Sequence, residues 1–178
     1  MIRPIQKPDI PRCLAWYNWY IAHSTATFEE QPLSLEAFSK RVDAVTARYP
    51  WLILEADGKP VGYACLDLFN SKSAYRFTAD VTVYLDPKET GKGYGKLLLK
   101  ALEEQAEQQG IQKLVSIITS DNTASRRLHE NLGYHLISEI HRVGYKQKQW
   151  LSAAWYEKDL GTFANPPQEP DFRKQEAL

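Results

Sequence analysis

The chain is poor in cysteine and has no excess of charge of either sign. Cys13 and Cys65, the two cysteines among 178 residues, are too few and too far apart for a disulfide framework or a zinc site. Lys plus Arg and Asp plus Glu number 22 each, which argues against a nucleic acid or an anionic membrane as partner, because both attract a large basic excess. The sequence also lacks a signal peptide and an apolar run of about 18 residues. These absences predict a cytoplasmic protein with no metal.

What the chain does contain is enough apolar material for a sizeable core. Hydrophobic residues make up 43% of the sequence and tryptophan occurs five times, so one domain of ordinary size is expected. We place this domain at residues 1–160. The remaining residues, 161–178, are proline-rich and polar, so we expect a tail without a packed fold of its own, available to wrap a partner subunit.

Hydrophobic periodicity and turn residues predict the order of helices and strands. Asp9 and Ser34 are suited to cap two N-terminal helices, and Asp57-Gly58 is a strong signal for a β-hairpin. The predicted helices cover residues 10–22, 35–49, 96–109 and 123–132, and the predicted strands cover residues 1–6, 51–56, 61–69, 75–85, 113–118, 134–146 and 150–160. This order is typical of a mixed α/β sheet with helices on both faces.

Three alternate glycines mark the point where the strand at 75–85 gives way to the helix at 96–109. Gly91, Gly93 and Gly95 lack side chains, so a ligand can approach the backbone closely. A helix start leaves about four backbone N–H groups unpaired and carries partial positive charge. Three lysines stand where a solvated helix start would favour acidic residues, namely Lys92, Lys96 and Lys100. The pattern indicates a phosphate site.

The glycine spacing separates this loop from two other phosphate loops. The dinucleotide fingerprint has two residues before its last glycine, and the Walker loop ends in Gly-Lys followed by Ser or Thr. Here Gly95-Lys96 is followed by Leu97. From spacing alone, a flexible turn with a basic surface remains the alternative.

A second polar cluster follows the predicted strand at 113–118. Asn122, Ser125 and His129 are spaced three and four residues apart, so on a helix they lie within roughly 60° of one another. Leu128 is expected on the side that faces the core. Three polar groups next to a strand end suit a site at the edge of the sheet. The alternative is a solvated helix face with Asn122 as its N-cap.

Several segments resemble one subfamily of acetyltransferases. The run from Asn122 to Tyr134 is similar to the Asn-x-x-Ser-x-x-Leu-His-Glu-x-x-Gly-Phe/Tyr segment of phosphinothricin and methionine sulfoximine or sulfone N-acetyltransferases, which belong to the GNAT superfamily. Thr90 to Gly95 resembles the acyl-CoA pyrophosphate loop of that superfamily, Arg/Gln-x-x-Gly-x-Gly/Ala. The other similar segments are Thr27-Phe28, Tyr75 to Tyr84, and Val143 to Lys146 followed by Trp150. The resemblance runs from about residue 2 to residue 160.

The resemblance implies a fold, a reaction and an oligomeric state. The fold is a mixed, mostly antiparallel central sheet, splayed at the acetyl-CoA site, with helices on both faces. The reaction is transfer of the acetyl group of acetyl-CoA to the primary amine of a small amino-acid-like substrate of the phosphinothricin, methionine sulfoximine or methionine sulfone type, by direct attack on the thioester. The subfamily also forms homodimers through its C-terminal strands, which would place residues 143–150 at an interface.

The same resemblance implies roles for individual residues. Asp80 is the general base, directly or through water, because a protonated amine must lose a proton before it attacks. His129 donates a proton to the CoA thiolate or makes a structural hydrogen bond. A backbone N–H near Leu85 stabilises the oxyanion. The residues expected to bind acetyl-CoA are Val83, Tyr84, Leu85, Thr90, Gly91, Lys92, Gly93, Tyr94, Gly95, Lys96, Asn122 and Ser125.

Two residues depart from the subfamily pattern. Thr90 stands where many members have Arg or Gln, which removes a side-chain contact to pyrophosphate and leaves the backbone donors. Asp80 stands where the subfamily has Glu, one methylene longer, which favours a bridging water between carboxylate and amine. These departures keep open a non-catalytic acyl-CoA-binding or regulatory module. A transferase acting on a peptide or protein amine is a further alternative.

Fewer residues are assigned to binding of the amine substrate than to binding of acetyl-CoA. A phosphinothricin-like substrate carries a carboxylate and a second polar or anionic group, so cationic and aromatic residues near the similar segments are candidates. We assign Phe28, Tyr75 and Arg76 to substrate binding. Further candidates are the cationic Lys72, Arg142 and Lys146 and the aromatic Trp150.

Overall fold

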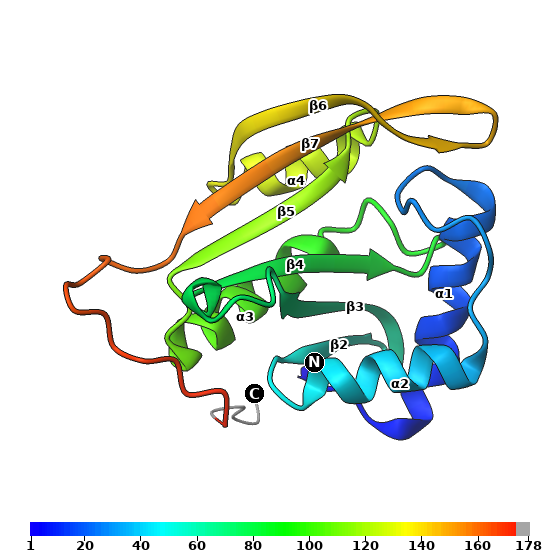
Figure 1. The fold of residues 1–178 in the computed structure, drawn as a ribbon. Coiled ribbons are helices and arrows are strands. Elements are labelled where there is room, and N and C mark those ends of the chain that lie inside the picture. The colour runs from blue at the N-terminus through cyan, green and yellow to red at the C-terminus, as the bar shows by residue number, and fades with distance from the viewer. Residues whose placement is uncertain (174–178) are drawn as a thin grey trace.

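Seven strands form one sheet in the computed structural model, which describes residues 1–173 (Figure 1). The strands are β1 (Ile2–Pro4), β2 (Trp51–Ala56), β3 (Lys59–Leu68), β4 (Thr78–Leu85), β5 (Lys113–Thr119), β6 (His135–Lys146) and β7 (Gln149–Asp159), in the spatial order β1-β2-β3-β4-β5-β7-β6. Neighbouring strands are antiparallel except for β4 and β5, which are parallel. The predicted mixed, mostly antiparallel sheet is confirmed. The last part of the predicted tail, 174–178, lies outside the described residues.

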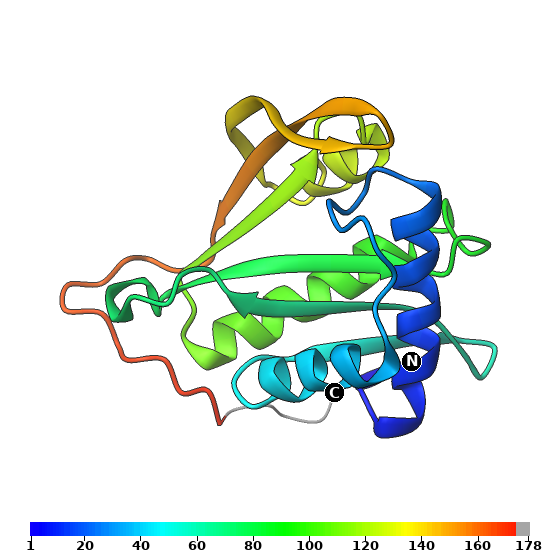
Figure 2. The same cartoon turned by 45° about the vertical axis from the view of Figure 1, so that its right-hand side comes forward.

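Helices cover both faces of this sheet. They are α1 (Ile10–His23), α2 (Leu35–Thr46), α3 (Tyr94–Gln109) and α4 (Thr123–Glu130), with short 3-10 turns at Lys7–Asp9 and Ser73–Tyr75. The helices α1 and α2 lie on one face, and α3 and α4 on the other (Figure 2). Apolar side chains such as Phe38, Ile53 and Leu98 are buried between helices and sheet, and their removal from water drives folding. No helix among these described residues is long and apolar enough to cross a membrane.

Capping and turn residues explain several element boundaries. The Ser34 hydroxyl accepts a hydrogen bond from the N–H of Ala37 at 3.1 Å, which confirms it as the N-cap of α2. Asp57 and Gly58 adopt φ of 50° and 70° and join β2 to β3, as the hairpin signal predicted. Gly110 ends α3 with φ of 84°.

The predicted start of α1 at residue 10 is confirmed, but the predicted side-chain cap at Asp9 and the predicted strand start at Tyr75 were wrong, and the helices predicted to end at residues 49 and 132 end at Thr46 and Glu130. Asp9 does not cap α1 with its side chain, because its carboxylate accepts hydrogen bonds from the Arg3 guanidinium at 2.7 and 2.9 Å and from the Gln6 N–H at 2.8 Å. The strand expected to start at Tyr75 begins at Thr78, because Tyr75 ends a 3-10 turn. The strand predicted from its aromatic and β-branched residues was therefore too long at its start.

The parallel strands β4 and β5 separate after a short contact. The paired residues are Thr78 with Lys113, Ala79 with Leu114 and Asp80 with Val115, and within residues 1–173 no further pair joins the two strands. Beyond Asp80 the sheet divides into two arms, β1-β2-β3-β4 and β5-β7-β6, which stand apart where β4 ends (Figures 1 and 2). Backbone groups of residues 81–85 on the β5 side are therefore available to a ligand. We call this split the fork, and it confirms the splayed sheet that the resemblance implied.

Residues 161–173 form no helix or strand and run back along the rest of the chain (Figure 1). The Arg76 guanidinium pairs with the Glu169 carboxylate. The Phe172 ring packs edge-on against Tyr49, with 5.4 Å between the ring centroids. Residues 161–173 therefore have no regular element of their own, and the Asp171 N–H donates to the Gln109 carbonyl at the end of α3 at 2.8 Å.

Candidate active site

A cavity of about 530 Å³ lies in the fork. Residues 81–85 of β4 form one wall and residues 116–118 of β5 form another. The glycine loop, the start of α4, and Tyr20 and Ala26 from α1 and the loop after it complete the lining. The cavity therefore brings together the glycine loop and the polar residues Asn122, Ser125 and His129, which are far apart along the chain.

The glycine loop presents an uncapped helix start to this cavity. Gly91 and Gly93 adopt φ of 78° and 83°, a left-handed conformation that other residues reach only with strain. Gly93 is the N-cap of α3, no side chain within residues 1–173 caps it, and the first turn holds no acidic residue. The helix begins at Tyr94, before the predicted Lys96. Its first N–H groups and the positive end of its dipole are thus free to hold an anion such as a pyrophosphate.

Gly95 serves the packing of α3 against α4. A Cβ added at Gly95 would lie 2.9 Å from Cδ2 of Leu128, closer than carbon atoms normally approach. The absence of a side chain therefore lets the two helices meet beside the cavity. Leu128, which was expected only to face the core, packs against the core and also lines the cavity.

All but two of the residues expected to bind acetyl-CoA line this cavity, the exceptions being Lys92 and Tyr94. The Lys92 ammonium pairs with the Glu89 carboxylate at 2.7 Å on the surface. Tyr94 is partly buried and packs against the hydrophobic core. Lys96 is the lysine of the helix start that lines the cavity, so it is the one placed to meet a phosphate.

Hydrogen bonds hold the polar face of α4. The Asn122 side chain caps the helix by accepting from the Ser125 N–H at 3.1 Å, and both residues also line the cavity. His129 is 1% exposed, and its Nδ1 lies 2.8 Å from the carbonyl oxygen of Ser125. Because a carbonyl oxygen only accepts, Nδ1 carries the proton and Nε2 of the neutral ring carries a lone pair. Burial lowers the pKa of His129, which favours this neutral form.

Asp80 lies at the base of the fork. It is the last residue of β4 that pairs with β5, and on the other side it faces Asp67 of β3. Burial and, to a smaller extent, the negative charge of Asp67 raise the pKa of Asp80 to about 7. Its Oδ1 is buried and has no hydrogen-bond partner among residues 1–173. Such a carboxylate can take up a proton near neutral pH.

A smaller cavity of about 150 Å³ lies on the face of β4 that α1 and α2 cover. It shares Thr82 and Tyr84 with the larger cavity, and it is also lined by Asp67 and Arg41. The Arg41 guanidinium pairs with the Glu29 carboxylate at 2.6 Å. Sequence reasoning missed Arg41, because one cation on an amphipathic helix carries no local signal of what it faces.

The structure does not bring the three assigned substrate residues together at either cavity. Phe28 lies in the loop between α1 and α2 and is 40% exposed. Tyr75 and Arg76 precede β4, at the end of that strand away from the opening of the fork. Tyr75 packs against Phe69, and Arg76 binds Glu169 of the tail. Within the described chain, Tyr75 and Arg76 are therefore engaged elsewhere.

The further cationic candidates also have other surroundings. Lys146 is 3% exposed, and its Nζ donates hydrogen bonds to the carbonyl oxygens of Ser24 at 2.9 Å and Thr27 at 2.7 Å. Lys72 and Arg142 are exposed and line neither cavity. Lys146 thus binds the protein's own backbone, a role taken up below.

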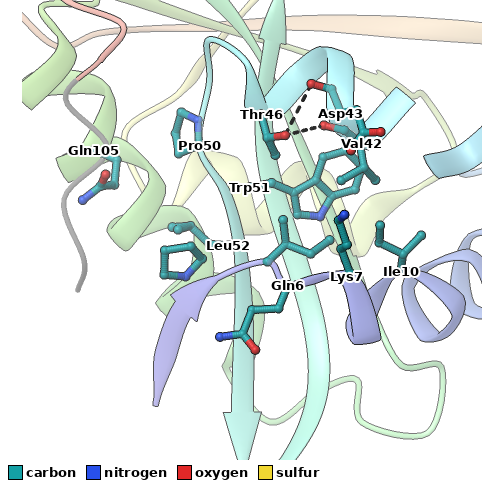
Figure 3. Close-up of a pocket in the computed structure, with 12 residues that line it drawn as sticks. Gln6, Lys7, Ile10, Val42, Asp43, Thr46, Pro50, Trp51, Leu52 and Gln105 are labelled. Atoms are coloured by element: carbon teal, nitrogen blue, oxygen red, sulfur yellow. Dashed lines mark hydrogen bonds between the residues drawn. The ribbon is translucent and has the colours of Figure 1, made fainter. Parts of the chain in front are cut away.

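Another cavity, of about 200 Å³, lies between β1, α2 and the start of β2 (Figure 3). Lys7 and Asp43 provide its charged groups, and the Thr46 hydroxyl donates to the Val42 carbonyl at 2.8 Å. No glycine lines it, whereas Gly91, Gly93 and Gly95 line the cavity in the fork together with the unpaired edge of β4. The cavity in the fork is therefore the candidate active site.

The site combines an uncapped, glycine-lined helix start, suited to an anion, with the unpaired edge of a split sheet, the arrangement that the resemblance implied for an acyl-CoA-dependent transferase. A model of the acetyltransferase (GNAT) family matches residues 13–134, and the chain belongs to this family.

Relatives and solved structures agree over almost the whole length. A phosphinothricin N-acetyltransferase from Streptomyces viridochromogenes is 31% identical over 165 residues, 93% of this chain and 90% of that protein. An L-methionine sulfoximine/L-methionine sulfone acetyltransferase from Pseudomonas paraeruginosa is 33% identical over 168 residues, 93% of this chain and 98% of that protein. The crystal structure of a GNAT superfamily phosphinothricin acetyltransferase from Sinorhizobium meliloti with acetyl-CoA has a TM-score of 0.89 and 29% identity, covering 96% of this chain and 92% of that one.

Proposed function

We propose that this protein transfers the acetyl group of acetyl-CoA to the primary amine of a small amino-acid-like substrate of the phosphinothricin, methionine sulfoximine or methionine sulfone type. The observation that carries the proposal is the fork, where an uncapped helix start and an unpaired strand edge line one cavity, with the half-buried Asp80 carboxylate, whose pKa is raised, at its base. The substrates in the names of the relatives support the amine class.

The glycine loop and the β4 edge are proposed to bind acetyl-CoA. Backbone N–H groups of residues 91–95 and the Lys96 ammonium hold the pyrophosphate. Thr90 lines the cavity and offers a hydroxyl where many family members have a longer donor. The pantetheine arm pairs with the free backbone groups of residues 83–85, as an added strand would. The reaction proposed here needs no metal ion.

Asp80 is proposed to accept the proton of the amine. Since Asp80 lies at the base of the fork and is not part of the cavity lining, a water molecule relays the proton. The amine nitrogen then forms a bond to the thioester carbonyl carbon, and a backbone N–H near Leu85 donates to the oxyanion. When the oxyanion collapses, the carbon–sulfur bond breaks and CoA leaves as a thiolate. The nitrogen of the new C–N bond loses its second proton to solvent, Asp80 releases the first to solvent, and the thiolate takes up one proton.

His129 is proposed to act as a hydrogen-bond acceptor and not as the acid. Its proton lies on Nδ1, bound to the Ser125 carbonyl, and burial disfavours a second proton on Nε2. The CoA thiolate is a good leaving group, since its pKa is near that of cysteine, so an acid is not essential. The lone pair of Nε2 is then available to a donor of the bound ligand.

The smaller cavity beside Thr82 and Tyr84 is proposed as part of the amine pocket. Its volume of about 150 Å³ suits one amino-acid side chain and not an extended peptide. This favours a free amino acid over the peptide or protein amine that the sequence left open.

A homodimer is proposed through the outer face of β6 and β7. Large apolar side chains are exposed there, namely Leu136, Ile137, Ile140, Val143, Tyr145 and Trp150. Several large apolar side chains exposed on two paired strands are typical of a protein interface. The free, buried Cys13 and Cys65 support the proposed cytoplasmic location.

The test is CoA thiol release from acetyl-CoA with L-phosphinothricin, methionine sulfone, methionine sulfoximine and plain amino acids as acceptors. We expect saturable release with one of the first three, and a fall of about 100-fold or more in kcat for Asp80→Asn. Asp57→Asn, in the β2–β3 turn, is the matched control and should keep the wild-type rate. Binding of acetyl-CoA without release for any acceptor would contradict the proposal and favour the acyl-CoA-binding module. Unchanged turnover in Asp80→Asn would reject Asp80 as the base.

A further inference from the structure

A buried lysine holds the loop between α1 and α2, residues 24–34. Lys146, the last residue of β6, is 3% exposed and donates to the carbonyl oxygens of Ser24 and Thr27 at 2.9 and 2.7 Å. Burying an ammonium group costs free energy unless its hydrogen bonds are satisfied, and a methionine of similar length would fill the same space without that cost. The positive charge is therefore explained by the backbone that it binds.

A second, independent contact joins the same strand to the same loop. A Cβ added at Gly144 would lie 2.6 Å from two ring carbons of Phe28. Gly144 is not among the glycines with positive φ, so its backbone conformation does not require glycine. The position must instead stay free of a side chain because the Phe28 ring occupies that space.

The loop also reaches both arms of the fork. The Thr119 hydroxyl of β5 donates to the carbonyl oxygen of Thr25, and the Thr25 hydroxyl donates to the Asp121 carboxylate at 3.1 Å. The Tyr84 hydroxyl of β4 donates to the carbonyl oxygen of Ala26 at 3.5 Å. Ala26 lines the large cavity. Both views show the loop spanning the open end of the fork toward the β6–β7 hairpin (Figures 1 and 2).

We propose that Gly144 and Lys146 dock this loop across the fork and thereby set the affinity for the amine substrate. On this inference, which rests on the function proposed above, Lys146 and Gly144 are positioning residues that act through Phe28 and the loop backbone. Alternation along β6 supports the division of labour, because Val143 and Tyr145 are 49% and 55% exposed on the opposite side. Residues 143–146 of β6 thus have an apolar outer face, and their inner face binds the loop of residues 24–34.

The position of the loop predicts which kinetic constant changes. The loop contacts β4, β5 and β6 near the open end of the fork, and none of its hydrogen bonds within residues 1–173 involves the glycine loop. It is joined to the smaller cavity, proposed above as part of the amine pocket, because Glu29 pairs with Arg41 at 2.6 Å and the Thr27 and Tyr17 hydroxyls lie 3.1 Å apart, and both Arg41 and Tyr17 line that cavity. Loosening it should therefore raise KM for the amine by about tenfold or more, as expected for lost hydrogen bonds to a charged group. The KM for acetyl-CoA should change less than about twofold.

The experiment compares Lys146→Met and Gly144→Ala with the control Lys59→Met, whose lysine is exposed at the start of β3. Steady-state KM values for amine and acetyl-CoA are measured, together with backbone hydrogen exchange of residues 24–29. Both test variants should raise the amine KM and speed exchange in that segment, and the control should do neither. Because both act through one loop, the double variant should show less than the product of the two effects.

Two kinetic outcomes would overturn the inference. One is an amine KM that stays at the wild-type value in both test variants, and the other is an equal rise in both KM values, which would indicate general destabilisation. If Lys146→Met fails to fold, Gly144→Ala still tests whether docking of the loop sets the KM for the amine. A wild-type protein that acetylates none of the amines would contradict the proposed function, while unchanged hydrogen exchange in residues 24–29 would contradict the docking itself.

Discussion

Asp80 and Asp67 lie directly opposite each other on β4 and β3, as paired residues of the antiparallel ladder. Asp80 is half-buried, with its Oδ1 enclosed, whereas Asp67 is exposed to solvent. Facing carboxylates on neighbouring strands disfavour each other's ionisation. Together with burial, which is the larger cause, this relationship brings the pKa of Asp80 to about 7, the range in which a general base can gain and lose a proton.

The pH dependence of activity should follow the ionisation of Asp80. In the wild type, kcat/KM for the amine should rise with pH through about 7, because the carboxylate must be charged to accept a proton. Asp67→Asn removes the facing charge, so the rise should move to lower pH, by about half a unit or less because solvent screens an exposed charge. Profiles measured at saturating acetyl-CoA test this. A shift to higher pH would contradict it.

Asp80→Asn should stabilise the folded protein at alkaline pH. The pKa of Asp80 is raised in the folded state, so the stability penalty of ionising it is absent below the unfolded pKa of about 4 and fully present above about 7. The variant should therefore gain on the order of 2 kcal/mol over the wild type at pH 8, and almost nothing near pH 4. Urea unfolding at the two pH values measures the gain. Equal gains at both would point to a cause other than charge.

Gly93→Ala should weaken acetyl-CoA binding specifically. Gly93 and Gly58 have φ of 83° and 70° and an open space where a Cβ would lie, so alanine should cost roughly 1 kcal/mol of stability at either position. Gly93→Ala should raise KM for acetyl-CoA several-fold, because the glycine lines the cavity, and Gly58→Ala should leave it unchanged. Thermal unfolding and initial rates separate the two effects. Equal KM values for acetyl-CoA in the two variants would show that the glycine loop does not bind acetyl-CoA.

His129→Ala should leave the shape of the pH–rate profile intact. The ring is buried, and burial lowers its pKa, so it should stay neutral above a pH of about 7, where Asp80 is ionised. Losing its hydrogen bond to Ser125 and opening a cavity should lower stability by about 1–3 kcal/mol. An alkaline limb that is present in the wild type and lost in the variant would assign His129 to proton donation instead.

Local chemistry made several features predictable. The Ser34 cap, the Asp57-Gly58 turn and the uncapped start at Gly93 each depend on residues a few positions apart. Such preferences hold wherever the segment ends up in the fold. The local preference for a capping residue did not predict Asp9 correctly, because the guanidinium of Arg3, in β1, donates hydrogen bonds to its carboxylate.

Contacts between distant segments were beyond local reasoning. Arg76 was assigned to substrate, but the tail brings Glu169 to it. Lys146 was a substrate candidate, but the loop after α1 surrounds it with carbonyl oxygens. Arg41 lines a cavity beside β4, although nothing in the sequence of α2 indicated that it would. In each case the partner of a charged side chain depended on the packing of another element.

The sequence by itself determined the strand, the glycine loop and the polar face of α4, because these features act through short-range backbone geometry, and the class of the protein followed from the resemblance of these motifs to a known family. Tertiary structure decided how these pieces meet. Only the separation of β4 from β5 beyond Asp80 creates the cavity, and only the crossing of the α1–α2 loop to Gly144 and Lys146 closes its open end. The reason is physical: burial and the pairing of charges depend on which distant segments pack together, and no single segment contains that information.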